Sequence, residues 1–466
     1  MNPSSITGDV WTWRLWGLGD SRLESAATVA TLALLVASRF ALLPSGPWEW
    51  DETLFARGLL SFDLPAHFPH PPGFPLWMAL GWVMLRLVGD PLRCFQLLSA
   101  AASCLAIFPL AALGRRAAPA PVAAAAAVAV LFAPAVWLHA GRGFTDTAAA
   151  FFAVWGAALA VHGLEGRRAT GFTLLLTAAF LIRPILLPPL GALWLAGALT
   201  VRPARKLFPG VFLGLAATAG AVAGLVLAQG SWSGFASSFV RHATTHARNL
   251  VEHNPGGVLD LGIVKGLGGP WSAAGVAILA LLGIVVWWRR ASRRGAVAWL
   301  VVLAVVVVQL VWLQNRKFPR YAVPLEMALA PLLAAVASAL APSIVAAGTL
   351  AGLGTVWVVG SFPLLVEQHT TPLPGWAAVQ QAVAEADQTA SELVVEPGLY
   401  PFLSYLEQFD LRRGHPWRFS WYLAPASPDS KALPSGRYLL VTDYPFHYFG
   451  SLDGGETRFP TASDRL

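Results

Sequence analysis

The sequence is poor in charged residues. Only 12% of its 466 residues are Asp, Glu, Lys or Arg, and 56% are hydrophobic, whereas soluble domains carry about 25% charged residues. A chain with so little charge and a mean hydropathy of +0.58 does not have the composition of a soluble protein. The composition therefore predicts a polytopic membrane protein.

Cysteine is also scarce. Cys94 and Cys104 lie ten positions apart within apolar sequence, so neither a disulfide framework nor a cysteine-based zinc site is supported, and we expect both to be small core residues. The N-terminal segment lacks a small-residue cleavage site after a short apolar core. This favours an uncleaved first helix over a signal peptide.

The excess of basic residues does not indicate nucleic-acid binding. The formal net charge is +7, but the arginines and lysines stand in small clusters between apolar runs. This is the pattern of cytoplasmic loops under the positive-inside rule. We therefore expect contact with membrane lipids and no nucleic-acid partner.

Apolar runs recur along residues 1–364, which we interpret as the transmembrane domain. Since a span needs about 20 residues, the sequence predicts about eleven transmembrane helices. They cover 25–43, 92–113, 119–138, 146–164, 170–182, 185–200, 208–228, 271–288, 296–313, 322–338 and 343–362, with a long outer loop over 229–269. If the run 73–88 also crossed, the Arg115-Arg116 pair would lie outside, so we expect an interfacial helix there. A break is expected at Arg183-Pro184, because proline prevents simple continuation of a helix.

The composition changes near residue 365. Acids, Gln, Ser and Pro return, and "ELVVEPG" and "RYLLVTDY" read as short strands, while "WAAVQQAVAEAD" reads as an amphipathic helix. We interpret 365–466 as a small soluble α/β domain on the extracytoplasmic side.

Four polar segments fall on the outer face in this topology, where charge near bilayer depth is costly and tends to be kept for function. They are Asp51-Glu52, "FPHPPGFPLW" with His70, "GRGFTDTAAAFF" with Arg142 and Asp146, and "QNRKFPRYAVPLEMALAPLL" with Arg316, Lys317 and Arg320. A carboxylate can accept a proton from an attacking hydroxyl. The basic cluster, which runs against the usual loop bias, suits an anionic ligand such as a lipid phosphate.

Each segment also has a structural explanation. The Asp51-Glu52 pair could be interfacial acids that end a loop, Pro71-Pro72 could simply start a helix, and Asp146 could be a helix N-terminal acid favoured by the dipole. Weaker candidates are Arg183 and the outer-loop residues Arg241, His242, His246, Arg248 and His253. The two histidines at positions i and i+4 could ligate a metal, but the acid of a zincin motif is missing.

Taken in order, these segments resemble the membrane glycosyltransferases of the GT-C superfamily. The branch is that of protein O-mannosyltransferases and lipid A aminoarabinose transferases. The resemblance rests on "WEWDETLFARGLL", "HPPGFPLW", "GRGFTDTAAAFF", "FLIRPILLPP" and "FPRYAVPLEMALAPLL", and it covers most of 25–340. It implies a helical GT-C-like fold in the cell inner membrane, with the active site on the extracytoplasmic side.

The resemblance also implies a reaction. The protein would pass a sugar from a polyprenyl-phosphate carrier to a lipid, glycan or protein acceptor. Asp51 matches the family's base, Glu52 its companion acid and Asp146 the second acid of the cavity. His70 stands where the aminoarabinose branch often has lysine, which argues against aminoarabinose transfer.

The remaining assignments concern the phosphate and the stereochemistry. Donor-phosphate contacts are expected from His70, Arg320, Lys317, Arg142 and Arg183. One displacement at the anomeric carbon predicts inversion. With no Asp-X-Asp motif in the sequence, no cofactor is required, and a divalent metal is compatible with the sequence but not demanded by it.

Two other classes of protein fit the spans and the intramembrane charges. A lipid or small-molecule transporter also needs them, although transporters tend to contain paired repeats and the 46–77 stretch has no second copy. A noncatalytic assembly protein could keep the fold and use its outer domain for binding.

Overall fold

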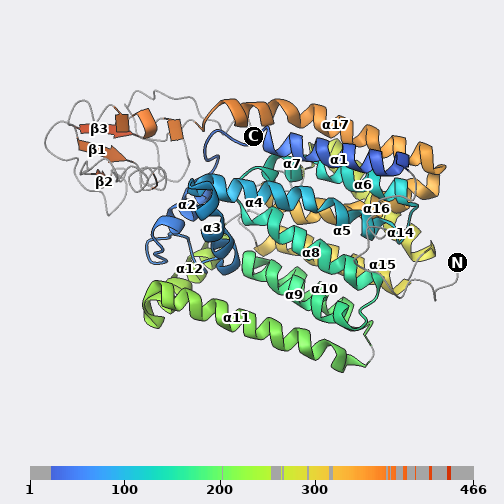
Figure 1. The fold of residues 1–466 in the computed structure, drawn as a ribbon, viewed down its shortest axis with the longest axis horizontal. Coiled ribbons are helices and arrows are strands. Elements are labelled where there is room, and N and C mark those ends of the chain that lie inside the picture. Colours follow the sequence, from blue (N-terminus) through green and yellow to red (C-terminus); the bar gives the residue numbers. More distant parts are fainter. Residues whose placement is uncertain are drawn as a thin grey trace.

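Helices make up nearly all of the part of the chain that the computed structural model describes (Figure 1). This part comprises residues 22–201, 203–252, 264, 267–290, 293–313 and 319–373, together with short pieces between 376 and 441. The α-helices are α1 (Arg22–Phe40), α2 (Trp50–Leu60), α3 (Pro75–Val88), α4 (Pro91–Leu105), α5 (Ile107–Gly114), α6 (Ala120–Leu131), α7 (Pro134–Ala140), α8 (Thr145–His162), α9 (Arg167–Ile182), α10 (Leu187–Ala198), α11 (Phe208–Gln229), α12 (Trp232–Glu252), α14 (Pro270–Arg290), α15 (Arg293–Val308), α16 (Val323–Leu340) and α17 (Ser343–Thr370). Short 3-10 helices are η3 (Pro184–Leu186), η4 (Ala204–Leu207) and η7 (Pro319–Ala322), and η6 (Gln309–Leu313) is a π-helical turn.

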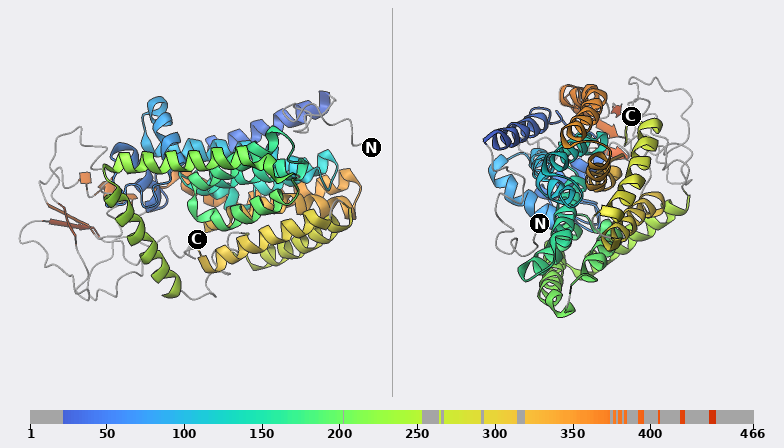
Figure 2. Two further views of the ribbon diagram at one scale, coloured as in Figure 1. Left: turned by 90° about the horizontal axis from the view of Figure 1, so that it is seen from below. Right: turned by 90° about the vertical axis from the view of Figure 1, so that its right-hand side faces the viewer.

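The long helices lie side by side in one bundle (Figures 1 and 2). Among the described residues, five helical segments are long and apolar enough to cross a membrane: Pro91–Gly114, Ala204–Gln229, Pro270–Arg289, Pro319–Leu340 and Ser343–Thr370. The bent pair α6–α7 makes a sixth if it is one span. The protein is a multi-pass membrane protein, and the total of about eleven spans stays a prediction.

The spans divide into central and peripheral helices. The most apolar windows of Pro91–Gly114 and Pro319–Leu340 are each 72% buried, whereas that of Ala204–Gln229 is 11% buried. Figure 1 accordingly shows α11 at the edge of the bundle. A helix that is apolar all round can leave its surface in hydrocarbon without cost, which explains why Phe212 and Leu227 are exposed.

Small residues let the central helix α16 approach its neighbours closely. A Cβ atom built on Gly283 of α14 would lie 2.7 Å from the carbonyl oxygen of Leu332 in α16, so only glycine permits this crossing. Cys94 and Cys104 are free and buried, as expected of small core residues.

The segment between α1 and α3 carries the acids Glu49, Asp51 and Glu52. Helix α2 starts directly after Glu49, and α3 starts at Pro75 after Gly73, whose φ of +92° is a conformation that glycine adopts without strain. The sequence predicts a start at Gly73, two residues earlier. Helix α3 runs across the long helices (Figure 2), which is the orientation that an interfacial helix requires.

Two spans are broken. The predicted break at Arg183-Pro184 is confirmed, since α9 ends at Ile182 and η3 begins at Pro184. The span predicted over 119–138 is instead two helices, α6 and α7, bent by 65°. The prediction missed this bend because Pro134 can start a helix as readily as it can kink one.

The predicted outer loop over 229–269 is largely helical in its first half. Trp232, Phe235 and Phe239 recur at spacings of three and four residues, so an amphipathic helix, α12, forms there. The sequence predicts this segment as the connection between two spans, and α12 lies in the chain between the candidate spans Ala204–Gln229 and Pro270–Arg289.

Strands occur at both predicted strand segments near the C-terminus. β1 (Glu392–Val395) pairs in parallel with β2 (Phe419–Trp421) and with β3 (Tyr438–Val441), in the order β2-β1-β3. Leu393 stands opposite Phe419 on one side and Leu439 on the other. The domain as a whole, and its boundary at residue 365, stay predictions.

Candidate active site

The start of α2 brings three acids together at one end of the bundle: Glu49, which directly precedes the helix, and Asp51 and Glu52 of its first turn. Glu52 is completely buried, and its two oxygens accept hydrogen bonds from backbone N–H groups: Oε2 from Trp48 (2.6 Å) and Glu49 (3.1 Å), and Oε1 from Gly143 (2.7 Å). Glu52 therefore ties the start of α2 to the loop between α7 and α8. A carboxylate engaged in this way positions the loop.

Asp51 points toward a different partner. Its Oδ2 accepts a hydrogen bond of 2.7 Å from Nη2 of Arg320, which lies 269 residues further along the chain in η7. Burial alone would raise the pKa of Asp51, but the Arg320 guanidinium holds that pKa below its usual value. Asp51 is therefore a carboxylate at neutral pH.

Arg320 is the centre of the charged cluster. Besides Asp51, its guanidinium contacts Glu49 through Nη1 and Asp146 through Nε, the latter at 3.8 Å. Its charge also lies 4.1 Å from the centroid of the Phe144 ring. An arginine this deeply buried needs such partners, because burying an unpaired charge is very costly.

Asp146 links Arg320 to the broken helix α9. It sits in the first turn of α8, and its Oδ1 forms a 3.0 Å ion pair with Nε of Arg183. Arg183 also donates a 2.6 Å hydrogen bond to Oγ1 of Thr145. The break at Pro184 thus leaves Arg183 at the helix end, where it reaches the start of α8.

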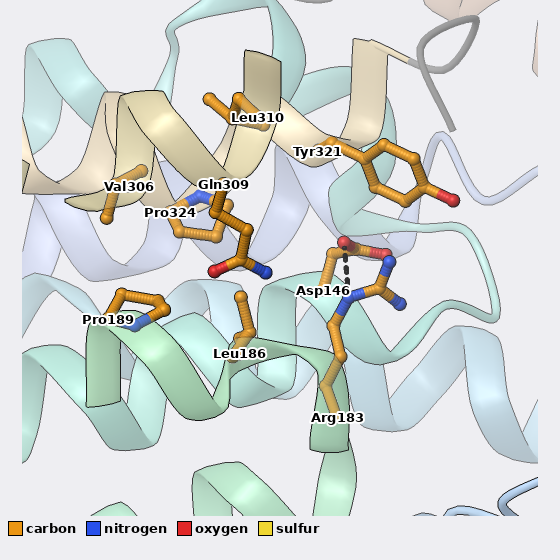
Figure 3. Close-up of a pocket in the computed structure, with 9 residues that line it drawn as sticks. All are labelled: Asp146, Arg183, Leu186, Pro189, Val306, Gln309, Leu310, Tyr321 and Pro324. Atoms are coloured by element: carbon orange, nitrogen blue, oxygen red, sulfur yellow. Dashed lines mark ion pairs between the residues drawn. The ribbon is translucent and has the colours of Figure 1, made fainter. Parts of the chain in front are cut away.

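A small pocket lies beside this ion pair (Figure 3). Its lining residues are Asp146, Arg183, Leu186, Pro189, Val306, Gln309, Leu310, Tyr321 and Pro324. The space that a water molecule can occupy is about 10 Å³, which is room for one water. Gln309 projects into it from the π-helical turn, with its amide nitrogen bonded to the Ile185 carbonyl at 2.6 Å.

His70 lies against the aromatic side of the cluster. Its ring centroid is 5.4 Å from that of Phe55, 4.7 Å from that of Phe74 and 5.8 Å from that of His242 in α12. Burial lowers the pKa of His70 to about 3, although Asp51 opposes the shift. His70 is therefore neutral near pH 7 and can offer a hydrogen bond rather than a positive charge.

Two solved structures of ArnT from Cupriavidus metallidurans are similar to this chain. The apo structure gives a TM-score of 0.57 at 16% identity and covers 85% of this chain and 86% of ArnT. The structure bound to undecaprenyl phosphate gives a TM-score of 0.56 at 16% identity, with 85% and 90% covered. No protein-family model matches the sequence, and no curated protein matches it significantly.

The chain has the GT-C fold. ArnT is an aminoarabinose transferase and a GT-C glycosyltransferase, so the resemblance read from the short sequence motifs is confirmed at the level of the fold. At 16% identity the likeness concerns how the helices are arranged.

Within this GT-C fold, most of the residues predicted for the site lie together. Asp51, Asp146, Arg183 and Arg320 form one chain of ion pairs. Arg142 joins it through Glu49, and its guanidinium also lies 5.6 Å from the Trp48 ring. Their assigned roles stay predictions.

Other predicted residues are not part of this chain of ion pairs. Lys317 and Arg316 lie outside the described residues. The side chains of His246, Arg248 and His253 lie outside them as well. Within the described ranges, no group of three or more His, Cys, Asp or Glu side chains is arranged to hold a metal ion.

The sequence analysis did not identify Glu49, which is a member of the charged cluster. Glu49 contacts both Arg142 and Arg320, yet it precedes the Asp51-Glu52 pair and looks like a loop residue. One signal was available in the sequence. Glu49 directly precedes the helix that begins with Asp51 and Glu52 in its first turn, so all three acids lie at the same end of that helix.

Proposed function

We propose that the protein is an inverting membrane glycosyltransferase that moves a sugar from a polyprenyl-phosphate carrier to an acceptor on the extracytoplasmic face. The fold shared with ArnT, one structure of which contains undecaprenyl phosphate, supports this proposal. The observation that carries it is the half-buried carboxylate of Asp51, which pairs with Arg320 in a charged cluster that also contains Arg142 and Arg183.

In the proposed reaction Asp51 is the base. The acceptor's hydroxyl proton passes to a carboxylate oxygen of Asp51 as the acceptor oxygen bonds to the anomeric carbon. The bond from that carbon to the phosphate oxygen breaks, and its electron pair leaves with the phosphate. Attack opposite the leaving group inverts the anomeric centre, and a low pKa keeps Asp51 ready to accept the proton.

The arginines stabilise the leaving phosphate. Arg142, Arg183 and Arg320, with Lys317, offer positive charge to the phosphate as negative charge develops on it, and His70 offers a neutral hydrogen bond. Asp146 fixes the direction of Arg183 through their 3.0 Å ion pair. The step as written balances without a cofactor or a metal ion.

The proposed setting is the cell inner membrane, with the site and the C-terminal domain facing outward. The acceptor would be a lipid, a glycan or a protein, because all three classes occur on the outer face of the membrane. His70 in place of a lysine favours a sugar other than aminoarabinose.

Replacing Asp51 with Asn tests the assignment. With a panel of undecaprenyl-phosphate hexoses and pentoses, we expect the Asp51→Asn protein to bind undecaprenyl phosphate like the wild type but to lose transfer by about a hundredfold to ten-thousandfold, the usual contribution of a general base. The matched control is Asp63→Asn in the same outer segment, where an amide oxygen can still accept the hydrogen bond from Ala66 (3.2 Å).

Unchanged sugar transfer by the Asp51→Asn protein would refute Asp51 as the base. A wild-type protein that moves the lipid across a bilayer and leaves every sugar–phosphate bond intact would refute transferase activity and support a transporter.

A further inference from the structure

Glu49 has no role in the proposed reaction, yet it bridges two of the three arginines in the charged cluster. Its Oε1 accepts a hydrogen bond of 3.3 Å from Nη1 of Arg142, and its Oε2 pairs with Nη1 of Arg320. The Glu49 side chain is 13% exposed, while those of the two arginines are 4% and 3% exposed. Two guanidiniums from distant elements thus converge on one carboxylate.

The guanidiniums of Arg142 and Arg320 form a site that suits a phosphate group, which we call the phosphate seat. Arginine forks bind the oxygens of carboxylates and phosphates in the same way. Arg142 comes from the loop between α7 and α8, and Arg320 from η7, so the two can grip opposite oxygens of one anion. Glu49 supplies that anion from within the chain.

The charge balance of the site makes two anions in this seat unfavourable. The described cluster contains four carboxylates and three guanidiniums. The carboxylates are Glu49, Asp51, Glu52 and Asp146, and the guanidiniums are those of Arg142, Arg183 and Arg320. A sugar donor linked through a phosphodiester brings one more negative charge, so its binding requires that one carboxylate leave or take up a proton.

We propose that Glu49 is a resident counter-anion that holds the seat between Arg142 and Arg320 and that the phosphate of the donor displaces it. The inference rests on the proposed function, because it assumes a phosphate-linked donor. It adds a specific seat for the phosphate and a residue that competes for that seat.

The surroundings of Glu49 allow it to give up its charge near neutral pH. Burial raises the pKa of Glu49 to about 7, although Arg320 and Arg142 oppose the shift, and the neighbouring Asp51 and Glu52 raise the pKa further. A donor phosphate that takes over the arginines removes the groups that favour the carboxylate form. The pKa of Glu49 therefore rises on binding, and donor binding takes up a proton.

The sign of the pH dependence follows from this proton uptake. Below about pH 7 Glu49 is already protonated, so donor affinity is high and constant. Above it, each bound donor must bring a proton to Glu49, and affinity falls by up to about tenfold per pH unit. One titrating group with a pKa of about 7 gives binding about tenfold weaker at pH 8 than at pH 6.

The test measures binding of the methyl diester of undecaprenyl phosphate to the purified full chain at pH 6 and pH 8. A diester is chosen because it keeps one negative charge at both pH values. We expect wild-type binding to weaken about tenfold between them, and Glu49→Gln to bind at both pH values as tightly as the wild type does at pH 6. Glu165→Gln, at an exposed position remote from the site, should retain the wild-type pH dependence.

The outcomes separate this inference from the proposed function. Wild-type binding that is equally tight at both pH values, or weaker binding by Glu49→Gln, overturns the role of Glu49 and leaves the glycosyltransferase proposal standing. Absence of wild-type binding at either pH overturns both. The wild-type comparison needs no variant, so a Glu49→Gln protein that fails to fold does not prevent the test.

Discussion

At the scale of the residue, Arg320 is where the site converges. Its guanidinium contacts Glu49, Asp51 and Asp146 and lies over the Phe144 ring. The planar fork of arginine can meet several acceptors at fixed angles, whereas lysine presents a single point charge. The shape of the side chain therefore matters here as much as its charge.

Replacing Arg320 with Lys should impair transfer although the charge is kept. We expect kcat/KM to fall at least about a hundredfold, which corresponds to about 2.7 kcal/mol, because one ammonium group cannot hold three carboxylates and a phosphate. Steady-state kinetics with the active donor measures the loss. Arg86→Lys in α3, at an exposed position, is the control, and an Arg320→Lys protein that matches this control would show that the fork geometry is dispensable.

The sequence identified Asp51, Asp146 and Arg320 as site residues because charge is costly near a membrane. It did not identify Glu49, whose partners Arg142 and Arg320 lie 93 and 271 residues away. Without those contacts, the position of Glu49 just before the Asp51-Glu52 pair does not show which groups it meets. Only the folded chain reveals that it bridges two arginines.

At the scale of the element, the broken span α6–α7 is contacted by two buried ionisable side chains from other helices. Arg39 of α1 donates a hydrogen bond to the carbonyl of Leu131 at the end of α6. Glu326 of α16 accepts hydrogen bonds from the N–H groups of Ala135 (3.4 Å) and Val136 (3.0 Å) at the start of α7. A cation thus faces the negative end of one helix dipole, and an acid faces the positive end of the next.

The break has a consequence for the site, because α7 leads directly into the loop that carries Arg142. Replacing Glu326 with Leu leaves two buried N–H groups unsatisfied, at a cost of about 1–3 kcal/mol each. We expect a lower thermal unfolding midpoint in detergent for Glu326→Leu, and a smaller decrease for Glu326→Gln, which keeps an acceptor oxygen.

Glu367→Leu in α17, which also removes an acid from a helix, controls for the added leucine. If Glu326→Leu unfolds at the same temperature as the wild type, the bend is maintained by packing rather than by this acid.

At the scale of the whole molecule, the charge pattern predicts which end of the bundle faces outward. The site lies at the end that carries α2, and the Arg167-Arg168 pair starts α9, a helix whose other end reaches the site through Arg183. The positive-inside rule assigns the arginine pair to the cytoplasm. The site would then be extracytoplasmic.

Cysteine labelling measures this orientation. The native Cys94 and Cys104 are buried, so background reaction should be small. We expect a membrane-impermeant maleimide to label Ala66→Cys in spheroplasts, whereas Glu165→Cys should react only after the membrane is permeabilised; both positions are exposed. The reverse pattern would invert the topology and remove the basis for an outward-facing site.

The sequence by itself determined the membrane class, the break at Pro184, and most of the charged residues that form the site. These are local properties, since apolar length, proline geometry and the cost of charge act over a few residues. Tertiary structure alone decided the bend before Pro134 and the bridging position of Glu49. Each of these depends on groups that are distant in the chain, such as Arg39, Glu326 and Arg320, and folding alone brings such groups into contact.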